Sequence, residues 1–279
     1  MRFLSSFTLI LLLSFNAFAN DFIDKEFKFS YGKYSKSKFS DTIAVINWHS
    51  EEGIKRFERT HLKGDFFRLA HHFKPQRHPA TCGIAASAIV LRGIYEKSGK
   101  KFPLLMSMPI TIGEKVYGLD YRDINEDNFF NDQTDKVMPR LAIQRMMRAN
   151  DGEFSGGIDI AELSKMLKIH DVGVKIKLIS DVSESLISEF RDEVISVVQD
   201  KDRFIIANYS HDYKSGLGAH YSPVVAYDKE SDSVLIMDVA AHREPWVWIN
   251  LKDVYLSMHT KNYAGNSYRG YMIISGNLK

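Results

Sequence analysis

The second half of the chain is dominated by short segments rich in β-branched and aromatic residues, and these segments limit the possible folds more than any other feature. VGVKIKLIS, residues 172–180, alternates apolar and polar side chains as a half-buried strand does. A helix is predicted over SESLISEFRDEVISVVQD, and further strands over RFIIANYS, AHYSPVVAY, SVLIMDV, PWVWI and RGYMIIS. The second half is therefore expected to be mostly antiparallel sheet.

The first half has mainly helical patterns. Helices are predicted from Ser50 onward, over GDFFRLAHHF, over CGIAASAIVLRGIYEK, around 136–149, and around 160–169 with Asp159 and Glu162 as a capping pair. Residues 100–133 are rich in Pro, Gly, Asp and Asn and predict a long irregular stretch with room for one short helix. Helices followed by an antiparallel sheet give an α+β fold.

The chain begins with the pattern of an export signal. Arg2 precedes an apolar run through Leu13, and Ala17-Phe18-Ala19 has the form of a cleavage site, so residues 1–19 predict a signal peptide. The apolar run is shorter than the roughly 20 residues that span a bilayer. We expect residues 20–279 to be exported, to the periplasm or the medium, without stable membrane association; an uncleaved anchor is the alternative.

The balance of charges gives no reason to expect a nucleic-acid partner. The formal net charge is +2, and the basic residues are dispersed rather than gathered in a block. A hydrophobic content of 44% is ordinary for a globular protein and is sufficient for a sizeable core.

The chain contains one cysteine, Cys82, at the predicted start of a helix. A single cysteine in an exported protein cannot form an intramolecular disulfide, so it is either a buried filler or a working thiol. The N–H groups and positive end of a helix stabilise a thiolate and lower the pKa of a cysteine. A nucleophilic role would also require a base.

Hairpin geometry suggests which histidine is that base. A turn centred on Lys229 would place His220 directly opposite Asp238, where the carboxylate could orient the imidazole. A slip by one residue would put the two side chains on opposite faces. Gln76, six residues before Cys82, could donate to an oxyanion beside the sulfur together with the Cys82 backbone N–H.

These residues carry a resemblance to a known family. LKGDFFRLAHHFKPQRHPATCGIAASAIVL, GLGAHYSPVVAYDKESDSVLIMDVA, PWVWI and RGYMIIS resemble the catalytic domain of the phytochelatin synthase family, in the same order and with similar spacing. The resemblance runs from about Ile46 to Ser275. It implies a papain-like fold of two lobes, a helical one carrying the cysteine and a sheet one carrying the histidine and aspartate, within a single catalytic domain over residues 20–279.

The resemblance also implies the chemistry. Cys82, His220, Asp238 and Gln76 match the family's nucleophile, base, orienting carboxylate and oxyanion donor. The expected substrate is glutathione, cleaved at its Cys-Gly bond to give γ-glutamylcysteine and glycine, with weak transpeptidation to phytochelatin. No cofactor is expected to be required, and heavy-metal ions such as Cd²⁺ or Zn²⁺ could activate as glutathione thiolates.

Arg269 has two interpretations of equal weight. The resemblance suggests that it binds a substrate carboxylate, for which a guanidinium has suitable bidentate geometry. The alternative is a surface arginine on the last strand.

Two departures from the family bear on transpeptidation. Ala241 stands where relatives generally carry a basic residue, with Arg243 two positions further on. We also expect no cysteine-rich C-terminal extension of the kind found in the longer members. Hydrolysis is therefore expected to dominate. Two other functions stay open: a leader-cleaving cysteine peptidase acting on longer peptides, and a non-enzymatic exported protein that binds glutathione or metal.

His71 and His72 could in principle bind a metal ion. Adjacent residues on a helix point about 100° apart, and no Cys or carboxylate near them in the sequence completes a site. We interpret them as core or surface histidines and predict no metal site.

Overall fold

The computed structural model describes residues 43–145, 157–211, 219–241, 245–262 and 267–276. Within these ranges the main element is a 7-stranded antiparallel sheet, and this confirms the α+β class. Its strand order is β1-β8-β7-β6-β5-β9-β4. The strands are β1 (Val45–Asn47), β4 (Gly173–Leu178), β5 (Arg203–Ser210), β6 (Ala219–Asp228), β7 (Ser233–Ile236), β8 (Val247–Asn250) and β9 (Gly270–Ser275).

The helices follow the predicted pattern with two differences. The helix predicted around 136–149 is two short helices up to Arg145, the rest of that range lying outside the described residues, and the helix after β8 was not predicted. The described helices are each too short or too polar to span a bilayer. They are α2 (Glu51–Arg59), α3 (Gly64–Leu69), the 3₁₀ turn η1 (Ala70–His72), α4 (Cys82–Ser98), α5 (Thr134–Val137), α6 (Arg140–Arg145), α7 (Ile160–Ile169), α8 (Glu184–Gln199) and α9 (Leu251–Met258).

Local signals account for where several helices begin. Ser50 caps α2 by accepting a hydrogen bond from the Gly53 N–H. Asp159 and Glu162 form the predicted capping box at the start of α7. These caps satisfy N–H groups that the first turn of a helix would otherwise leave unpaired.

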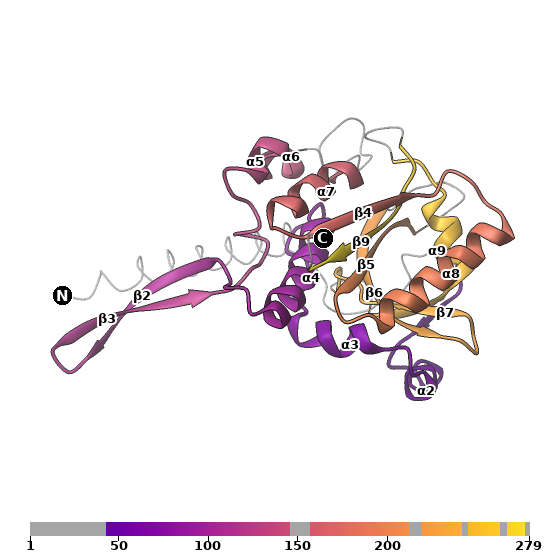
Figure 1. Ribbon diagram of the computed structural model, residues 1–279, viewed down its shortest axis with the longest axis horizontal. Coiled ribbons are helices and arrows are strands. Elements are labelled where there is room, and N and C mark those ends of the chain that lie inside the picture. The colour runs from indigo at the N-terminus through magenta and orange to yellow at the C-terminus, as the bar shows by residue number, and fades with distance from the viewer. Residues whose placement is uncertain (1–42, 146–156, 212–218, 242–244, 263–266, 277–279) are drawn as a thin grey trace, which may run out of the picture. The chain divides into compact units, whose positions relative to one another are not determined.

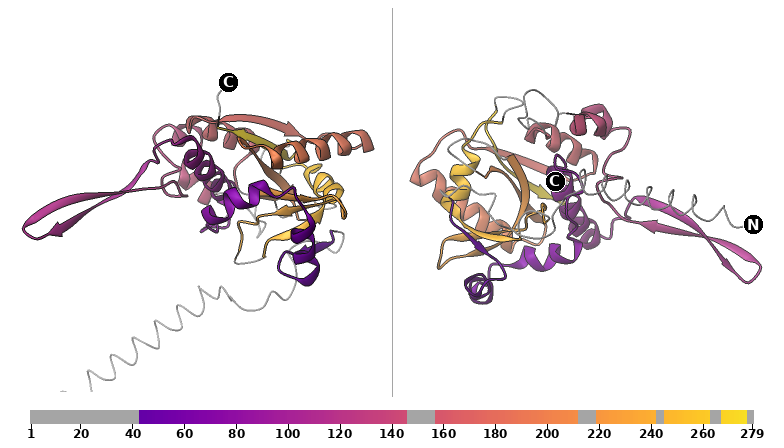
Figure 2. Two further views of the ribbon diagram at one scale, coloured as in Figure 1. Left: turned by 60° about the horizontal axis from the view of Figure 1, so that its bottom comes forward. Right: turned by 180° about the vertical axis from the view of Figure 1, so that it is seen from behind.

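Helices cover both faces of the sheet (Figures 1 and 2), with α3, α4 and α7 against one face and α8 and α9 against the other. Side chains of β5 alternate accordingly: Phe204 and Ile206 pack in the cluster with α4, and Ile205 and Ala207 pack in the cluster with α8. The first half of the chain also contributes to the sheet, because β1 forms one of its edges beside β8.

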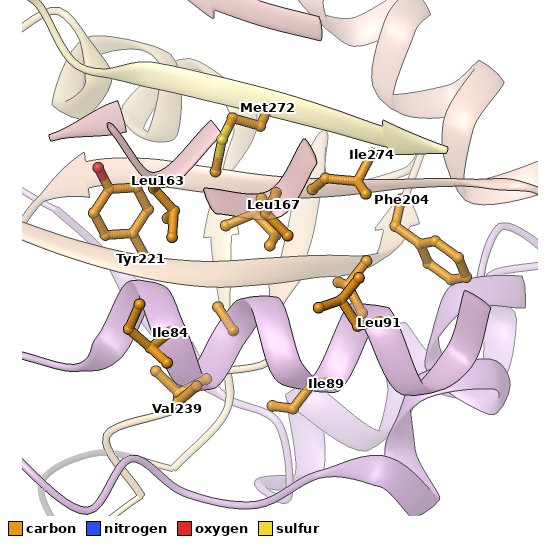
Figure 3. Close-up of a cluster of buried hydrophobic side chains, with 14 of the residues drawn as sticks. Ile84, Ile89, Leu91, Leu163, Leu167, Phe204, Tyr221, Val239, Met272 and Ile274 are labelled. Atoms are coloured by element: carbon orange, nitrogen blue, oxygen red, sulfur yellow. The ribbon is translucent and has the colours of Figure 1, made fainter. Parts of the chain in front are cut away.

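Helix α4 is the centre of the larger core cluster. Every residue from Cys82 to Tyr95 is buried, as expected for a helix whose sides are nearly all apolar or small. Figure 3 shows how its side chains meet those of α7, β5, β6 and β9. The first turn of this helix is therefore held rigidly against the sheet.

The prediction of an irregular stretch over 100–133 is wrong for residues 104–122 and is confirmed for residues 123–133, which contain no helix or strand. Residues 104–122 form a two-stranded hairpin of β2 (Leu104–Ile112) and β3 (Lys115–Arg122), which extends away from the sheet in Figures 1 and 2. Gly113, at φ 63°, opens its two-residue turn. Pro109 is tolerated because each strand of an isolated hairpin is an edge strand.

Gly270 allows β4 and β9 to pair closely. A Cβ added there would lie 1.9 Å from the Lys177 carbonyl oxygen, which is backbone and cannot turn aside. We predict that Gly270→Ala lowers the free energy of unfolding by about 3 kcal/mol, the upper part of the range for overpacking. Chemical denaturation measures the change, and Gly118→Ala is the control, since its Cβ would meet only Ser107 Oγ at 3.8 Å. Equal stability of the two variants would contradict the prediction.

Candidate active site

The structure brings three of the predicted side chains together at the junction of α4 and the sheet. Cys82 is the first residue of α4, His220 lies at the start of β6, and Asp238 lies two residues beyond the end of β7. His220 Nε2 donates to Asp238 Oδ1 at 2.8 Å, and both side chains are buried.

His220 and Asp238 meet although the predicted register is wrong. The turn spans Lys229–Asp232 rather than centring on Lys229, and Asp228 pairs with Ser233. A bulge then shifts the register, so that Val224 pairs with Ile236.

This bulge decides on which face Asp238 lies. Continued past Ile236, the shifted register puts Asp238 across from Ser222, two residues from His220 on the same face. Such diagonal neighbours are within reach of a long side chain. Without the shift, the two side chains would lie on opposite faces of the sheet.

The surroundings of Cys82 favour its thiolate. Burial raises the pKa of the thiol, but hydrogen bonds with His220 and with the backbone N–H groups of Tyr221 and Gly83 outweigh burial, so the pKa lies below its ordinary value. The start of α4 adds a positive helix end. The Tyr221 and Gly83 donors could not be foreseen from sequence motifs.

The hydrogen bonds around His220 fix which of its nitrogens can act as a base. Because Nε2–H donates to the carboxylate, Nδ1 is the nitrogen left to exchange a proton with the thiol. Asp238 Oδ1 also accepts from the Ala240 N–H at 2.7 Å, and the His220 carbonyl accepts from Asn208 Nδ2 at 3.2 Å. Hydrogen bonds to the ring and to the backbone carbonyl of His220 therefore both fix the position of the imidazole.

Gln76 is near the site but is not directed at the sulfur. Its backbone N–H donates to the Val239 carbonyl at 2.8 Å, next to Asp238. Its amide nitrogen donates to the carbonyls of His78 at 3.0 Å and Pro79 at 3.2 Å. The Gln76 Oε1 is buried and has no hydrogen-bond partner among the described residues. In this conformation the Gln76 side chain therefore stabilises the loop before Cys82 by hydrogen bonds to its carbonyls.

Glu126 is a positioning residue that the sequence did not single out. It is buried, and its carboxylate accepts from the Arg77 N–H at 3.0 Å and from the Thr81 hydroxyl. Arg77 and Thr81 flank the turn that leads into Cys82. Glu126 lies in the stretch predicted to be irregular, so only the fold reveals that it ties this turn to the rest of the site.

Arg269 is not on the surface as its second interpretation held. The side chain is 1% exposed and donates to Thr260 Oγ1 at 2.6 Å and the Lys261 carbonyl at 2.8 Å. Burial lowers the pKa of Arg269, and none of its contacts within the described residues is with a carboxylate.

The arrangement of Cys82, His220 and Asp238 is that of a thiol nucleophile, a base and an orienting carboxylate. The family model described as phytochelatin synthase matches residues 36–271. This chain belongs to the phytochelatin synthase family. The match covers most of the described residues and contains the whole candidate site.

Curated relatives of the family are plant and fungal enzymes. The chain is 28% identical over 241 residues to glutathione γ-glutamylcysteinyltransferase 3 of Lotus japonicus, covering 83% of this chain and 42% of the relative. It is 27% identical over 235 residues to glutathione γ-glutamylcysteinyltransferase 1 of Arabidopsis thaliana, with the same coverage of 83% and 42%. A 119-residue match to the Schizosaccharomyces pombe enzyme is 29% identical and covers 42% of this chain and 28% of that one. The chain thus spans less than half the length of these relatives.

The thiolate of this phytochelatin synthase family member should depend on His220. Replacing His220 with alanine leaves burial opposed only by the backbone donors, so the pKa of Cys82 should rise. We predict that alkylation by iodoacetamide at pH 7 slows about tenfold and that the pH–rate profile moves to higher pH. The readout is specific because the chain has one cysteine. His61→Ala, at an exposed histidine, is the control, and an unmoved profile in His220→Ala would refute the assignment.

Proposed function

We propose that this protein cleaves the Cys-Gly peptide bond of glutathione, releasing glycine and γ-glutamylcysteine. The observation that carries the proposal is the hydrogen-bonded series of Cys82, His220 and Asp238 in a member of this family. The printed names of the relatives, glutathione γ-glutamylcysteinyltransferases, support glutathione as the substrate.

The reaction proceeds in two halves. The Cys82 sulfur attacks the carbonyl carbon of the Cys-Gly bond, and His220, having taken the thiol proton, gives it to the departing glycine nitrogen. This leaves γ-glutamylcysteine joined to Cys82 as a thioester. His220 then takes a proton from water, the hydroxide adds to the thioester carbonyl, and the Cys82 sulfur leaves and regains the proton.

Two further residues are assigned roles in substrate binding and charge stabilisation. Gln76 donates to the oxyanion after exchanging one of its two loop carbonyl contacts for it. Arg269 binds a substrate carboxylate, and its burial without a carboxylate partner among the described residues supports this role. The charges of Cys82 and Arg269 both act on Tyr221, so both groups lie near it. Burial raises the pKa of Tyr221, Cys82 raises it further, and Arg269 lowers it.

The finer architecture and the cell compartment are also proposals. We assign a papain-like two-lobe arrangement, with Cys82 on the helical side of the site and His220 and Asp238 on the sheet side. We assign residues 20–279 to one catalytic domain and residues 1–19 to a signal peptide for export. Residues 1–19 lie outside the described residues.

The deciding experiment incubates the purified protein with glutathione and follows γ-glutamylcysteine, glycine and the adduct on Cys82 by mass spectrometry. Cys82→Ser should abolish turnover and adduct together. Gln76→Ala should lower kcat by about 10²-fold to 10³-fold, whereas Arg269→Gln should mainly raise KM. Cleavage of a long peptide in preference to glutathione would favour the leader-peptidase alternative, and absence of any turnover would favour the binding-protein alternative.

Hydrolysis should prevail over transfer to a second glutathione. Transfer requires a peptide with two carboxylates to be held beside the thioester, which favours free cationic groups near the site. Ala241 is uncharged, and Arg243 lies outside the described residues. The three cations that line a cavity of about 220 Å³ beside α4 are already paired: Lys74 and Arg92 with Asp123, and Arg77 with Glu126 and Asp127.

We therefore predict that γ-glutamylcysteine and glycine are the main products, with little (γ-glutamylcysteine)₂-glycine, and that Ala241→Arg raises the share of transfer product. Product ratios over time, with and without Cd²⁺ or Zn²⁺, measure this. Ala241→Gln is the control because it adds bulk without charge. Dominant formation of the longer product by the unmodified protein would contradict the prediction.

A further inference from the structure

His71, His72 and Glu96 form a cluster on the surface, away from the candidate active site. His71 Nε2 lies 3.0 Å and His72 Nε2 lies 2.9 Å from the same oxygen, Glu96 Oε2. The ligand atoms that the three side chains offer all lie within 4.8 Å of one another. Two imidazoles and a carboxylate thus point one donor atom each at a common place.

The sequence predicted no metal site here because it supplied no third ligand near the two histidines. The missing ligand comes from α4, whose Glu96 is 24 residues beyond His72. The two imidazole rings lie against each other, tilted by 41° with centroids 3.7 Å apart, so both reach the same side of η1 although they are adjacent in sequence. The tertiary packing of η1 on α4 therefore creates the cluster.

Packing around the cluster fixes its geometry before any ion arrives. Gly93 lets the end of α3, which leads directly into η1, approach α4, since a Cβ there would lie 2.8 Å from Leu69 Cδ2. Arg92, one turn before Glu96 on α4, donates to the His72 carbonyl at 2.9 Å. Arg92 is itself held by Asp123 at 2.7 and 2.6 Å.

We propose that His71, His72 and Glu96 bind one divalent transition-metal ion, with Zn²⁺ as the matching ion. Imidazole nitrogens and a carboxylate oxygen are ordinary Zn²⁺ ligands, and water would complete a tetrahedral set of four. The side chains of His71 and Glu96 are 53% and 58% exposed, so the ion can enter from solvent.

The charges at this position suit a cation. The Glu96 carboxylate supplies a negative charge beside both imidazoles. Glu96 lies in the last turn of α4, where the negative helix end favours a cation. Two cations near the cluster have carboxylate partners of their own: Arg92 pairs with Asp123, and Lys97 pairs with Asp202.

The proposed site is distinct from the catalytic centre. Glu96 lies fourteen residues after Cys82 on the same helix, which corresponds to roughly 21 Å along its axis. A second group of possible ligands, His211, His220 and Asp238, is buried and includes two residues of the candidate active site. Any test must therefore separate binding at the surface cluster from binding near Cys82.

Calorimetric titration of the full chain with Zn²⁺ measures affinity, and absorption spectra with Co²⁺ as a probe report the ligand type. The wild-type protein should bind one equivalent at the cluster. His72→Ala and Glu96→Gln should each weaken binding by more than about tenfold, because even residues that only support ligands contribute that much. His61→Ala, at an exposed histidine outside the cluster, and Cys82→Ser, which removes the thiol, should bind as wild type does.

The Co²⁺ spectrum gives an independent criterion. A site of two nitrogens and one carboxylate oxygen shows d–d bands without a thiolate charge-transfer band. Absence of saturable binding, binding unchanged in both cluster variants, or binding lost in Cys82→Ser with a thiolate band in the wild type would overturn the proposal. Unfolding curves of the variants establish that lost binding reflects lost ligands rather than lost fold.

Discussion

Complete burial of the first part of α4 is the constraint on which the candidate site depends. A helix buried on all sides must carry small residues wherever another element comes close, and Gly83 is such a position. A Cβ on Gly83 would lie 2.9 Å from Leu163 Cδ2 and 3.3 Å from Tyr221 Cδ2. Close contact with α7 and β6 at this point brings the Cys82 thiol to the backbone N–H of Tyr221 and to His220. Packing of the core and activation of the thiol therefore have the same cause.

Burial of a thiol near a base has opposing effects on its reactivity. Desolvation alone would keep Cys82 protonated and inert, as it does for buried cysteines in apolar surroundings. Here a base and two N–H donors reverse the direction of the shift. The site also carries buried Asp238, whose charge is satisfied by His220 and by the Ala240 N–H. A buried polar group of this kind is tolerated only when each partner is present.

The parts of the fold predicted from sequence are those with local causes. Asp159 and Glu162 correctly predict the start of α7 because both partners of the capping box lie within one helical turn. The hairpin of β2 and β3 was missed because Pro109 and Gly113 resemble loop residues, and its apolar side chains do not face a core. Glu126 was missed because its partners Arg77 and Thr81 are more than forty residues away. The pairing of His220 with Asp238 was foreseen, yet its register depends on a bulge for which the sequence carries no clear signal.

The two ends of α4 carry opposite partial charges, and an ionisable side chain lies at each end. At the first residue, the positive helix end favours the Cys82 thiolate; at the last turn, the negative end disfavours the Glu96 carboxylate and favours a cation beside it. Such an effect is worth about 0.3–1 kcal/mol at an exposed helix end and up to about 2 kcal/mol at a partly buried one. The hydrogen bond from His72 and, to a smaller extent, that from His71 lower the pKa of Glu96. The carboxylate therefore remains charged although it lies at the negative end of the helix. A bound divalent cation would offset that repulsion through its positive charge, and the same helix dipole would then stabilise the nucleophile and the metal ion at opposite ends.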